Sequence, residues 1–432
     1  MSVTNPISEL AARDAGPAAN DAAPDAEGRG AERDDFGRDG ARAPIRSAWP
    51  TYAEDEVAAA MSVLRSGRVN ALQHGERNRA FEAAFARLCR TNHAIAVANG
   101  TLGLELALRA FELGPGDDVV VTSRSFIASA SCVVNAGAAP VFADVDPDTQ
   151  NLTAETVAEA LTERTKAIIV VHLAGRPCEM DELAALAKAR GLVLIEDCAQ
   201  AHGATYRGRP VGGIGDAGVF SFCTDKIMST GGEGGMLVLN DDDAWSRAWS
   251  YKDHGKSYDL VNQRTSGDSF RWVHASVGTN FRLTEMQAAI GLRQLAKLPE
   301  WVAARRERAA ALNAAFAGLD ALRAPVTPSH LGHAFYKYYA FVVPEALKEG
   351  WSRDRILREA GARGAPCQSG SCPEIYREQA FSAYAPDGHR TLPTANALGA
   401  ASVLIPVDHT IAFADVERVG DIVRSVVLEA TR

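Results

Sequence analysis

One lysine stands where it could react with a carbonyl compound rather than remain a solvated surface charge. Lys226 follows an apolar strand pattern that ends at Phe222, and it precedes the glycine-rich loop 229–235. Glycines in such a loop let the backbone approach neighbouring groups closely. A lysine between a buried strand and a closely packed loop is suited to act as a nucleophile and a proton shuttle.

A carboxylate suited to the same chemistry ends another strand pattern. The strand pattern 192–197 consists of four apolar residues followed by Glu196-Asp197. A carboxylate at the end of a strand can hold a protonated pyridine nitrogen by a charge-assisted hydrogen bond. The plain alternative for Asp197 is an aspartate that caps a following helix.

A candidate phosphate site follows a third strand pattern. Residues 94–99 read AIAVAN, and Gly100-Thr101 lead into a helical pattern that starts at Leu102. Glycine permits a tight turn, and the free amides of a first helical turn favour an anion. Taken alone, these residues also fit an ordinary helix start.

These groups need a scaffold that brings strand ends together. Continuous Val/Ile patterns alternate with helical ones between 94 and 240, which indicates an α/β fold with a mostly parallel sheet covered on both faces. Ligands of such sheets bind beyond the carboxyl ends of the strands. The expected strands are 94–99, 118–122, 140–145, 166–173, 192–197, 218–222 and 235–239, with helices at 102–112, 154–162 and 181–190. The last two strands are close together and can depart from the strand–helix–strand rule.

The chain divides into three expected parts. Residues 1–45 hold few large apolar side chains and are predicted to be a disordered tail. Residues 46–317 are expected to form a large α/β domain with an N-terminal helical segment. Residues 318–432 contain a strand pattern at 336–344 and helical patterns near 352–362 and 412–430, which predict a smaller α+β domain.

Two helices outside the sheet region have recognisable ends. Thr51 and Glu54 fit a capping box, and Gly67 fits the position that ends that helix. Residues 284–317 are helical in pattern, and Pro299 is expected to start a new helix after a break.

Composition excludes several classes of protein. The net charge is −9 without a long Lys/Arg patch, which argues against a nucleic-acid-binding protein. No apolar stretch is long enough to span a bilayer and no secretory signal pattern is present, so a cytoplasmic location is expected. The seven cysteines include no CxxC pair, and no metal site is expected.

Several motifs in a fixed order resemble one family. The sequence GT, then EDCAQAHGA, then FSF, and then Lys226 before GGEGG resembles the DegT/DnrJ/EryC1/StrS family of pyridoxal-phosphate-dependent sugar aminotransferases. The later NFRLTEMQAA, residues 280–289, resembles that family's N-Y-R-M-T-E-x-Q-A-A motif. The likeness runs from about residue 46 to the C-terminus and implies the fold-type-I architecture.

The resemblance implies a role for each matching residue. Lys226 would form the Schiff base with pyridoxal 5′-phosphate (PLP), and Asp197 would hold the pyridinium nitrogen. Gln200 would lie on the O3′ side of the ring, and Phe126 would stack on it, unless that ring merely packs in the core. His202 would lie near the cofactor or be an inert core histidine. The phosphate would be bound by Gly100, Thr101, the Leu102 amide, Ser221 and, from the neighbouring subunit of a homodimer with shared active sites, Asn280.

The same resemblance implies the reaction. The amino group would pass from L-glutamate to a nucleotide-linked keto sugar, for amino-sugar or surface-polysaccharide biosynthesis. Loop 229–236 is similar to the T-T-G-E-G-G form of the C4-acting branch, whereas the C3-acting branch reads G-D-G-G or G-D-A-G. Three segments depart from the family pattern and are expected to bear on the acceptor: residues 223–225, Lys337, and residues 367–376.

Three alternative functions follow from the same residues. A sugar dehydratase on this scaffold would usually carry histidine in place of Lys226. A non-catalytic PLP-bound regulator would have no use for the complete set of Lys226, Asp197 and Gln200. An aminotransferase with two small amino-acid substrates would need paired arginines for dicarboxylates, which the sequence alone does not place.

Overall fold

The computed structural model describes residues 45–71, 75–263, 270–384 and 391–432. Apart from Ile45, the predicted tail 1–45 lies outside the described residues. No helix in the described ranges is both long enough and apolar enough to cross a bilayer.

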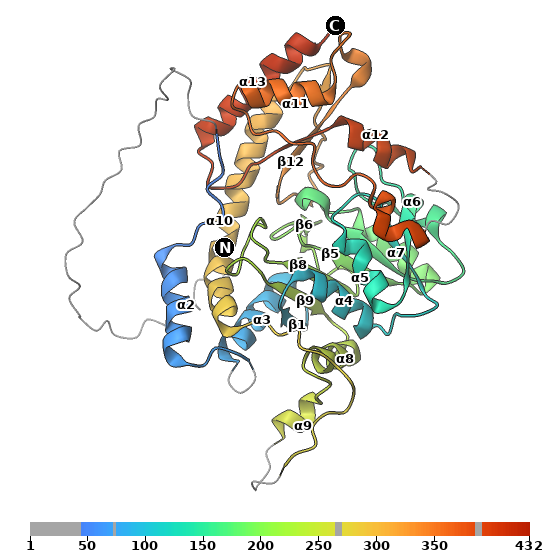
Figure 1. The fold of residues 1–432 in the computed structure, drawn as a ribbon, viewed down its shortest axis with the longest axis vertical. Helices are drawn as coiled ribbons and strands as arrows, with labels where there is room; N and C mark the ends of the chain where they lie inside the picture. The colour runs from blue at the N-terminus through green and yellow to red at the C-terminus, as the bar shows by residue number, and fades with distance from the viewer. Residues whose placement is uncertain (1–44, 72–74, 264–269, 385–390) are drawn as a thin grey trace, which may run out of the picture.

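A seven-stranded sheet forms the centre of the molecule (Figure 1), with the order β1-β9-β8-β5-β4-β2-β3. The pairs from β8 through β5, β4 and β2 to β3 are parallel, whereas β9 is antiparallel to both β1 and β8. The prediction of a mostly parallel sheet is therefore confirmed, with β9 as the exception to the crossover rule. The strands are β1 (His93–Val97), β2 (Asp118–Thr122), β3 (Ala139–Ala143), β4 (Thr165–Val171), β5 (Val193–Asp197), β8 (Ala217–Ser221) and β9 (Gly235–Leu239).

Helices cover the sheet where the periodicity predicted them, and also where it did not. The predicted ranges are occupied by α4 (Gly100–Ala110), α6 (Ala154–Ala160) and α7 (Met180–Arg190). The helices α3 (Glu76–Cys89), α5 (Ala128–Ala136) and α8 (Asp242–Lys252) were not predicted. The α5 sequence ASASCVVNA has weak helix propensity, but Ala130, Cys132 and Val133 are buried in the main core, so packing decides its conformation.

The helix α2 (Glu54–Ser66) begins later than its sequence signal indicated. The predicted cap at Thr51 is wrong: Ala53 is the N-cap, and its amide donates to the Glu56 carboxylate inside the first turn. Gly67, with φ of 69°, ends the helix as predicted. Val57, Met61 and Leu64 are 40%, 41% and 56% exposed, so α2 presents an apolar face to the outside.

The helix α10 runs without a break from Glu285 to Phe316, over 32 residues. The predicted new helix at Pro299 is therefore wrong. A proline in a helix interior loses one backbone hydrogen bond and costs about 3 kcal/mol. Leu295, Leu298 and Val302 on either side of it are nearly fully buried, and this packing holds the helix together across the proline.

A second unit lies at the C-terminal end of α10 (Figure 1). Its sheet consists of β10 (Leu322–Arg323), β12 (Tyr338–Val342) and β13 (Ser402–Ile405), and α11 (Arg353–Ala362) and α13 (Phe413–Ala430) pack on it, as the strand and helix patterns predicted. Leu312 and Phe316 of α10 belong to the same core. The helix therefore joins the two units, and a domain boundary at 317/318 stays a prediction. The remaining elements are β6 (Thr205–Tyr206), β7 (Arg209–Pro210), β11 (Leu331–Gly332), α9 (Tyr258–Asn262), α12 (Pro393–Ala401) and the 3₁₀ turns Leu173–Gly175, Pro344–Ala346, Ile375–Arg377 and Gln379–Tyr384.

A buried carboxylate holds the loop between β7 and β8 against the sheet by hydrogen bonds. Glu196 of β5 accepts the amides of Gly212, Ile214 and Gly215 at 2.7–2.8 Å and contacts His172 Nε2 at 3.0 Å. Gly218 of β8 lies against this loop so closely that a Cβ there would stand 2.3 Å from the Gly212 backbone. Only glycine at position 218 therefore allows the loop to pack against β8, beside the strand ends of β5 and β8 that form the site.

We expect Gly218→Ala to destabilise the protein by about 2 kcal/mol or more, because neither backbone can retreat without breaking the Glu196 hydrogen bonds. The apparent melting temperature of the purified protein measures this loss. Gly361→Ala is the matched control, since α11 leaves nothing within 4 Å of a Cβ there, and it should gain up to about 1 kcal/mol. Equal melting temperatures for the two variants would contradict the close approach.

Candidate active site

The predicted site residues come from one edge of the sheet. The strands β1, β2, β5 and β8 point the same way, so their carboxyl ends lie together. Asp197 ends β5, Ser221 ends β8, and Asn99 and Ser125 follow β1 and β2. Lys226 follows β8 after one turn, so the structure gathers the lysine, the carboxylate and the start of α4 on this edge.

Asp197 is a buried carboxylate without a cationic partner. Its Oδ2 accepts the Ser129 hydroxyl at 2.7 Å, and its Oδ1 accepts the Ala199 amide at 3.1 Å. In the part of the chain that the structure describes, no lysine, arginine or histidine nitrogen lies within 4.0 Å of it. Burial raises the pKa of Asp197, against the effect of the Ser129 hydrogen bond, the Ala199 amide and the charge of Lys226.

This environment fits a protonated pyridine ring. A carboxylate that burial destabilises gains most from a cationic N–H donor, and the ring nitrogen of PLP supplies one. The alternative of a helix cap does not fit, because a turn follows β5 where a capped helix would begin.

Lys226 is mostly enclosed, with 16% of its side chain exposed. Its Nζ lies 3.3 Å from Oδ1 of Asp225 and 5.2 Å from the centre of the Tyr336 ring. The Tyr336 hydroxyl donates to the other oxygen of Asp225. The amine is thus held by a carboxylate from its own loop and an aromatic ring from the segment before β12.

Gln200 has one end fixed and the other available. Its Oε1 accepts the Ala174 amide at 2.7 Å. Gly175, with φ of 88°, lets this loop approach, since a Cβ there would stand 2.8 Å from the Gln200 carbonyl. The Nε2 donors have no partner among the described residues and can serve a ligand oxygen, as expected for the O3′ side of the ring.

The start of α4 is packed directly onto Ser221. A Cβ on Gly100 would stand 2.8 Å from the Ser221 Cβ, so only glycine allows this contact. Asn99 caps the helix by accepting the Leu102 amide at 2.9 Å. Among the described residues, the amides of Gly100 and Thr101 and the Thr101 hydroxyl have no hydrogen-bond partner and can serve a phosphate. The Ser221 oxygen accepts the Cys223 amide at 3.4 Å and keeps its own proton to donate, whereas the Leu102 amide would first have to leave Asn99.

Phe126 and Asn280 are both exposed on the single chain. Phe126 is 64% exposed, which rules out the alternative of simple core packing. Asn280 lies next to the segment 281–282, which pairs with the end of β1, and its Oδ1 accepts the Arg282 amide at 3.3 Å.

His202 belongs to an aromatic core. Its ring lies 5.4 Å from Phe220 and 5.6 Å from Phe222, centre to centre. Neither ring nitrogen has a hydrogen-bond partner among the described residues, and burial lowers its pKa to about 3. A neutral ring between two phenylalanines favours the interpretation as a core residue.

Three groups of this site were missed in the sequence. Ser129 lies one turn into α5, a helix that periodicity did not reveal. Asp225 stood only as the last residue of an atypical tripeptide, and Tyr336 as part of an apolar strand pattern. Asp225 and Tyr336 are 111 positions apart, so no local pattern could have paired them.

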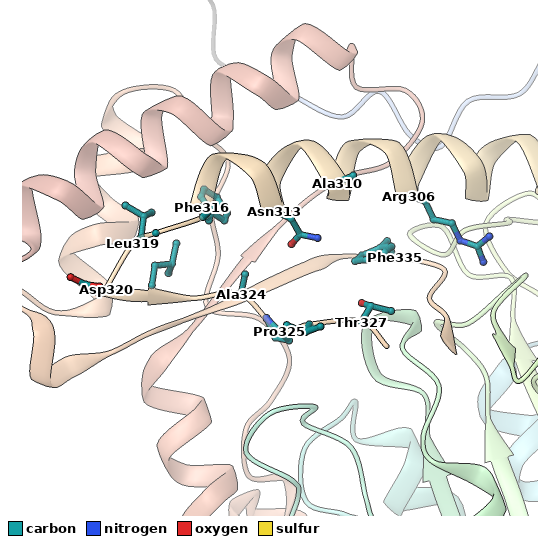
Figure 2. A pocket seen from close by; sticks show the side chains of 14 residues that line it. Arg306, Ala310, Asn313, Phe316, Leu319, Asp320, Ala324, Pro325, Thr327 and Phe335 are labelled. Carbon is teal, nitrogen blue, oxygen red and sulfur yellow. The ribbon is translucent and has the colours of Figure 1, made fainter. Parts of the chain in front are cut away.

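Two other features do not add to this site. The buried atoms of His172, Glu196 and Cys198 lie within 4.8 Å of one another, but Glu196 is already engaged by three amides and His172. A hollow of about 650 Å³ lies between the second half of α10 and residues 318–335 (Figure 2), lined among others by Arg306, Asn313 and Phe335. None of the strand-end residues lines it.

Comparison with known proteins identifies relatives over most of the chain. A model of the DegT/DnrJ/EryC1/StrS aminotransferase family matches residues 50–424. GDP-perosamine synthase of Caulobacter vibrioides is 39% identical over 345 residues, covering 78% of this chain and 87% of that protein. The structure of an aminotransferase from Psychrobacter cryohalolentis is 46% identical with a TM-score of 0.87, covering 90% and 100% of the two chains. The structure of DesI in the presence of its TDP-sugar product is 30% identical with a TM-score of 0.77, covering 89% and 93%.

We expect added PLP to be fixed onto Lys226 by borohydride, because this amine lies beside Asp225 at the strand ends. Peptide mapping by mass spectrometry locates the label. Lys337 is the matched comparison, since its Nζ lies 4.9 Å from the same Tyr336 ring: Lys337→Ala should keep the label and Lys226→Ala should lose it. A label on Lys337 in the unaltered protein would contradict the assignment.

Proposed function

The chain belongs to the DegT/DnrJ/EryC1/StrS aminotransferase family, and from this premise we propose that it transfers an amino group from L-glutamate to carbon 4 of a nucleotide-linked keto sugar. It is an enzyme, a PLP-dependent aminotransferase. The sugar substrate is supported by the relatives, among them GDP-perosamine synthase and DesI with its TDP-sugar product. A cytoplasmic location, expected from the composition, is part of the proposal.

The single observation that carries this function is that Lys226 and the buried carboxylate of Asp197 lie at the same edge of the sheet, and that Asp197 has no cationic partner among the described residues. Bound PLP supplies an aldehyde and an electron-withdrawing pyridinium ring. In the proposal, Asp197 keeps the ring nitrogen protonated and Lys226 moves the proton at the substrate carbon. Asp225 holds the Lys226 amine whenever that amine is not bonded to the cofactor.

The other residues of this edge position the cofactor in the proposal. Gly100, Thr101 and Ser221 bind the phosphate from their own subunit, and Leu102 joins them if Asn99 releases its amide. The Nε2 donors of Gln200 hold the O3′ side of the ring, and the exposed Phe126 covers one face of it. Lys226 is present and mostly enclosed. This disfavours a dehydratase, which would usually carry histidine at that position, and a non-catalytic regulator, which would not need the lysine.

The proposed regiochemistry rests on the loop after Lys226. Thr230 Oγ1 donates to the Glu233 carbonyl at 2.6 Å, and Gly232 donates its amide to Ser229 Oγ at 3.2 Å. Gly231 and Gly232 have φ of 80° and 109°, so the loop keeps a shape that other residues would strain. A rigid loop beside the reactive amine determines which carbonyl carbon can reach it, and its sequence is similar to the C4-acting branch.

We expect the enzyme to aminate a nucleotide-linked 4-keto-6-deoxyhexose and to leave the 3-keto isomer unchanged. Each sugar is supplied separately with L-glutamate, and NMR locates the new carbon–nitrogen bond. GDP- and TDP-linked forms of both sugars form the matched set, since the nucleotide is not fixed by this proposal. An amine found only at carbon 3 would overturn the regiochemistry and leave the aminotransferase activity intact.

The proposal includes a homodimer with shared active sites. Asn280 carries a polar amide at an exposed position near the end of β1, and by resemblance it serves the phosphate of the neighbouring subunit. The apolar face of α2, formed by Val57, Met61 and Leu64, is exposed on the single chain. An apolar face of this kind favours contact with a second copy.

We expect two inactive variants to restore activity when mixed. Lys226→Ala removes the amine, and Asn280→Asp places a carboxylate against the phosphate. If the subunits exchange, equal mixing should restore about a quarter of the wild-type turnover, because half of the dimers are mixed and each has one intact site. Exchange is verified by mass spectrometry of differently tagged chains. Mixed dimers without activity would show that Asn280 serves its own subunit or none.

A further inference from the structure

A second lysine lies over the same aromatic ring as Lys226. Lys337 precedes β12 in the C-terminal unit, and its Nζ lies 4.9 Å from the centre of the Tyr336 ring. The Nζ of Lys226 lies 5.2 Å from the centre of the same ring. Two cations from distant parts of the chain therefore share one aromatic side chain.

The carboxylates near Lys337 are already engaged by other donors. Asp225 is paired with Lys226 and accepts the Tyr336 hydroxyl. Asp408 accepts the amide of Thr410 at 3.1 Å and its hydroxyl. Across the described residues, no carboxylate lies within 4.0 Å of Lys337 Nζ, so its charge has no direct partner.

The surroundings of Lys337 favour an incoming anion. Burial lowers its pKa, and the positive charge of Arg305 lowers it further. Arg305 itself is buried, and its Nη1 donates hydrogen bonds to the carbonyls of Phe335 and Tyr336 at 3.4 and 3.1 Å. A half-buried ammonium that lacks a counter-charge gains most from a ligand that brings one.

The proposed reaction limits which anion this is. The amino group of the donor must take the place of the Lys226 amine, and the α-carboxylate of an amino acid is joined to the same carbon as that amino group. Its oxygens therefore lie about 3 Å from the reacting nitrogen. In a nucleotide-linked keto sugar, the sugar ring separates the keto carbon from the diphosphate by several more bonds.

We propose that Lys337 binds the α-carboxylate of the amino-acid donor. The inference rests on the proposed function and adds to it a donor site formed by the C-terminal unit against the strand edge. It also moves Lys337 from the acceptor, where the sequence pattern alone put it, to the donor. A lysine is a point charge on a flexible stem, so it would hold any α-amino acid and leave the choice of donor side chain to other groups.

The test compares two ligands that differ in this one group. 2-Methyl-L-glutamate carries the α-carboxylate and no proton on its α-carbon, and 4-aminopentanoate is the same amine without the α-carboxylate. The binding of each to the PLP-loaded enzyme is followed by the absorbance of the cofactor. Lys337→Met removes the charge at similar length, and Lys337→Arg keeps it.

We expect Lys337→Met to bind 2-methyl-L-glutamate at least tenfold more weakly and 4-aminopentanoate within threefold of the wild type. Lys337→Arg should bind both ligands within threefold of the wild type. The affinities for GDP and TDP, measured by calorimetry, should not change in either variant. This pattern is not produced by a general disturbance of the fold, which would weaken both amines alike.

Two results would overturn the inference while leaving the aminotransferase function in place. One is an equal change for both amines, or for neither. The other is a tenfold loss of affinity for GDP or TDP with the amines unchanged, which would give Lys337 to the nucleotide diphosphate. A wild-type enzyme whose cofactor responds to neither amine would instead refute L-glutamate as the donor, and the inference with it.

Discussion

The site depends on a carboxylate that is buried without a cation. Asp197 ends a strand in the middle of the sheet, and in the described part of the chain its side chain accepts hydrogen bonds from one hydroxyl and one amide. Removing such a charge from water costs free energy that two neutral hydrogen bonds offset only in part. A protonated ring nitrogen is the kind of group that would offset this cost, and in the proposed function the cofactor supplies it. The elements packed around Asp197 keep water away from its carboxylate.

The neighbouring carboxylate of β5 differs from Asp197, because groups of the protein itself compensate its charge. Glu196, one residue earlier, points to the other face and is fully engaged by three amides and His172. Burial acts against its charge, yet these contacts lower its pKa. One carboxylate is thus a permanent anchor for the loop before β8, while the other is left for a ligand. The alternation of side chains along a strand is what separates the two roles.

The C-terminal unit supplies part of the surroundings of Lys226. Tyr336 comes from the segment that leads into β12, and its hydroxyl holds Asp225 beside Lys226. Arg305 of α10 donates to the Tyr336 carbonyl, so the long helix that joins the two units also supports this segment. A break at Pro299 would have separated these contacts. Continuity of α10 is therefore a requirement of the site, and the buried side chains around the proline provide it.

The sequence by itself determined the chemistry and the class of fold. Lys226, Asp197 and the start of α4 could be proposed as site residues because strand ends, glycines and polar residues obey local rules, and because parallel strands bring their carboxyl ends to one edge. Tertiary structure alone decided the rest. It made a helix of residues 128–136 and carried α10 through Pro299, since burial outweighs propensity in both places. It also brought the Tyr336 ring to Lys226 across more than a hundred residues, where no periodicity in the sequence could record the contact.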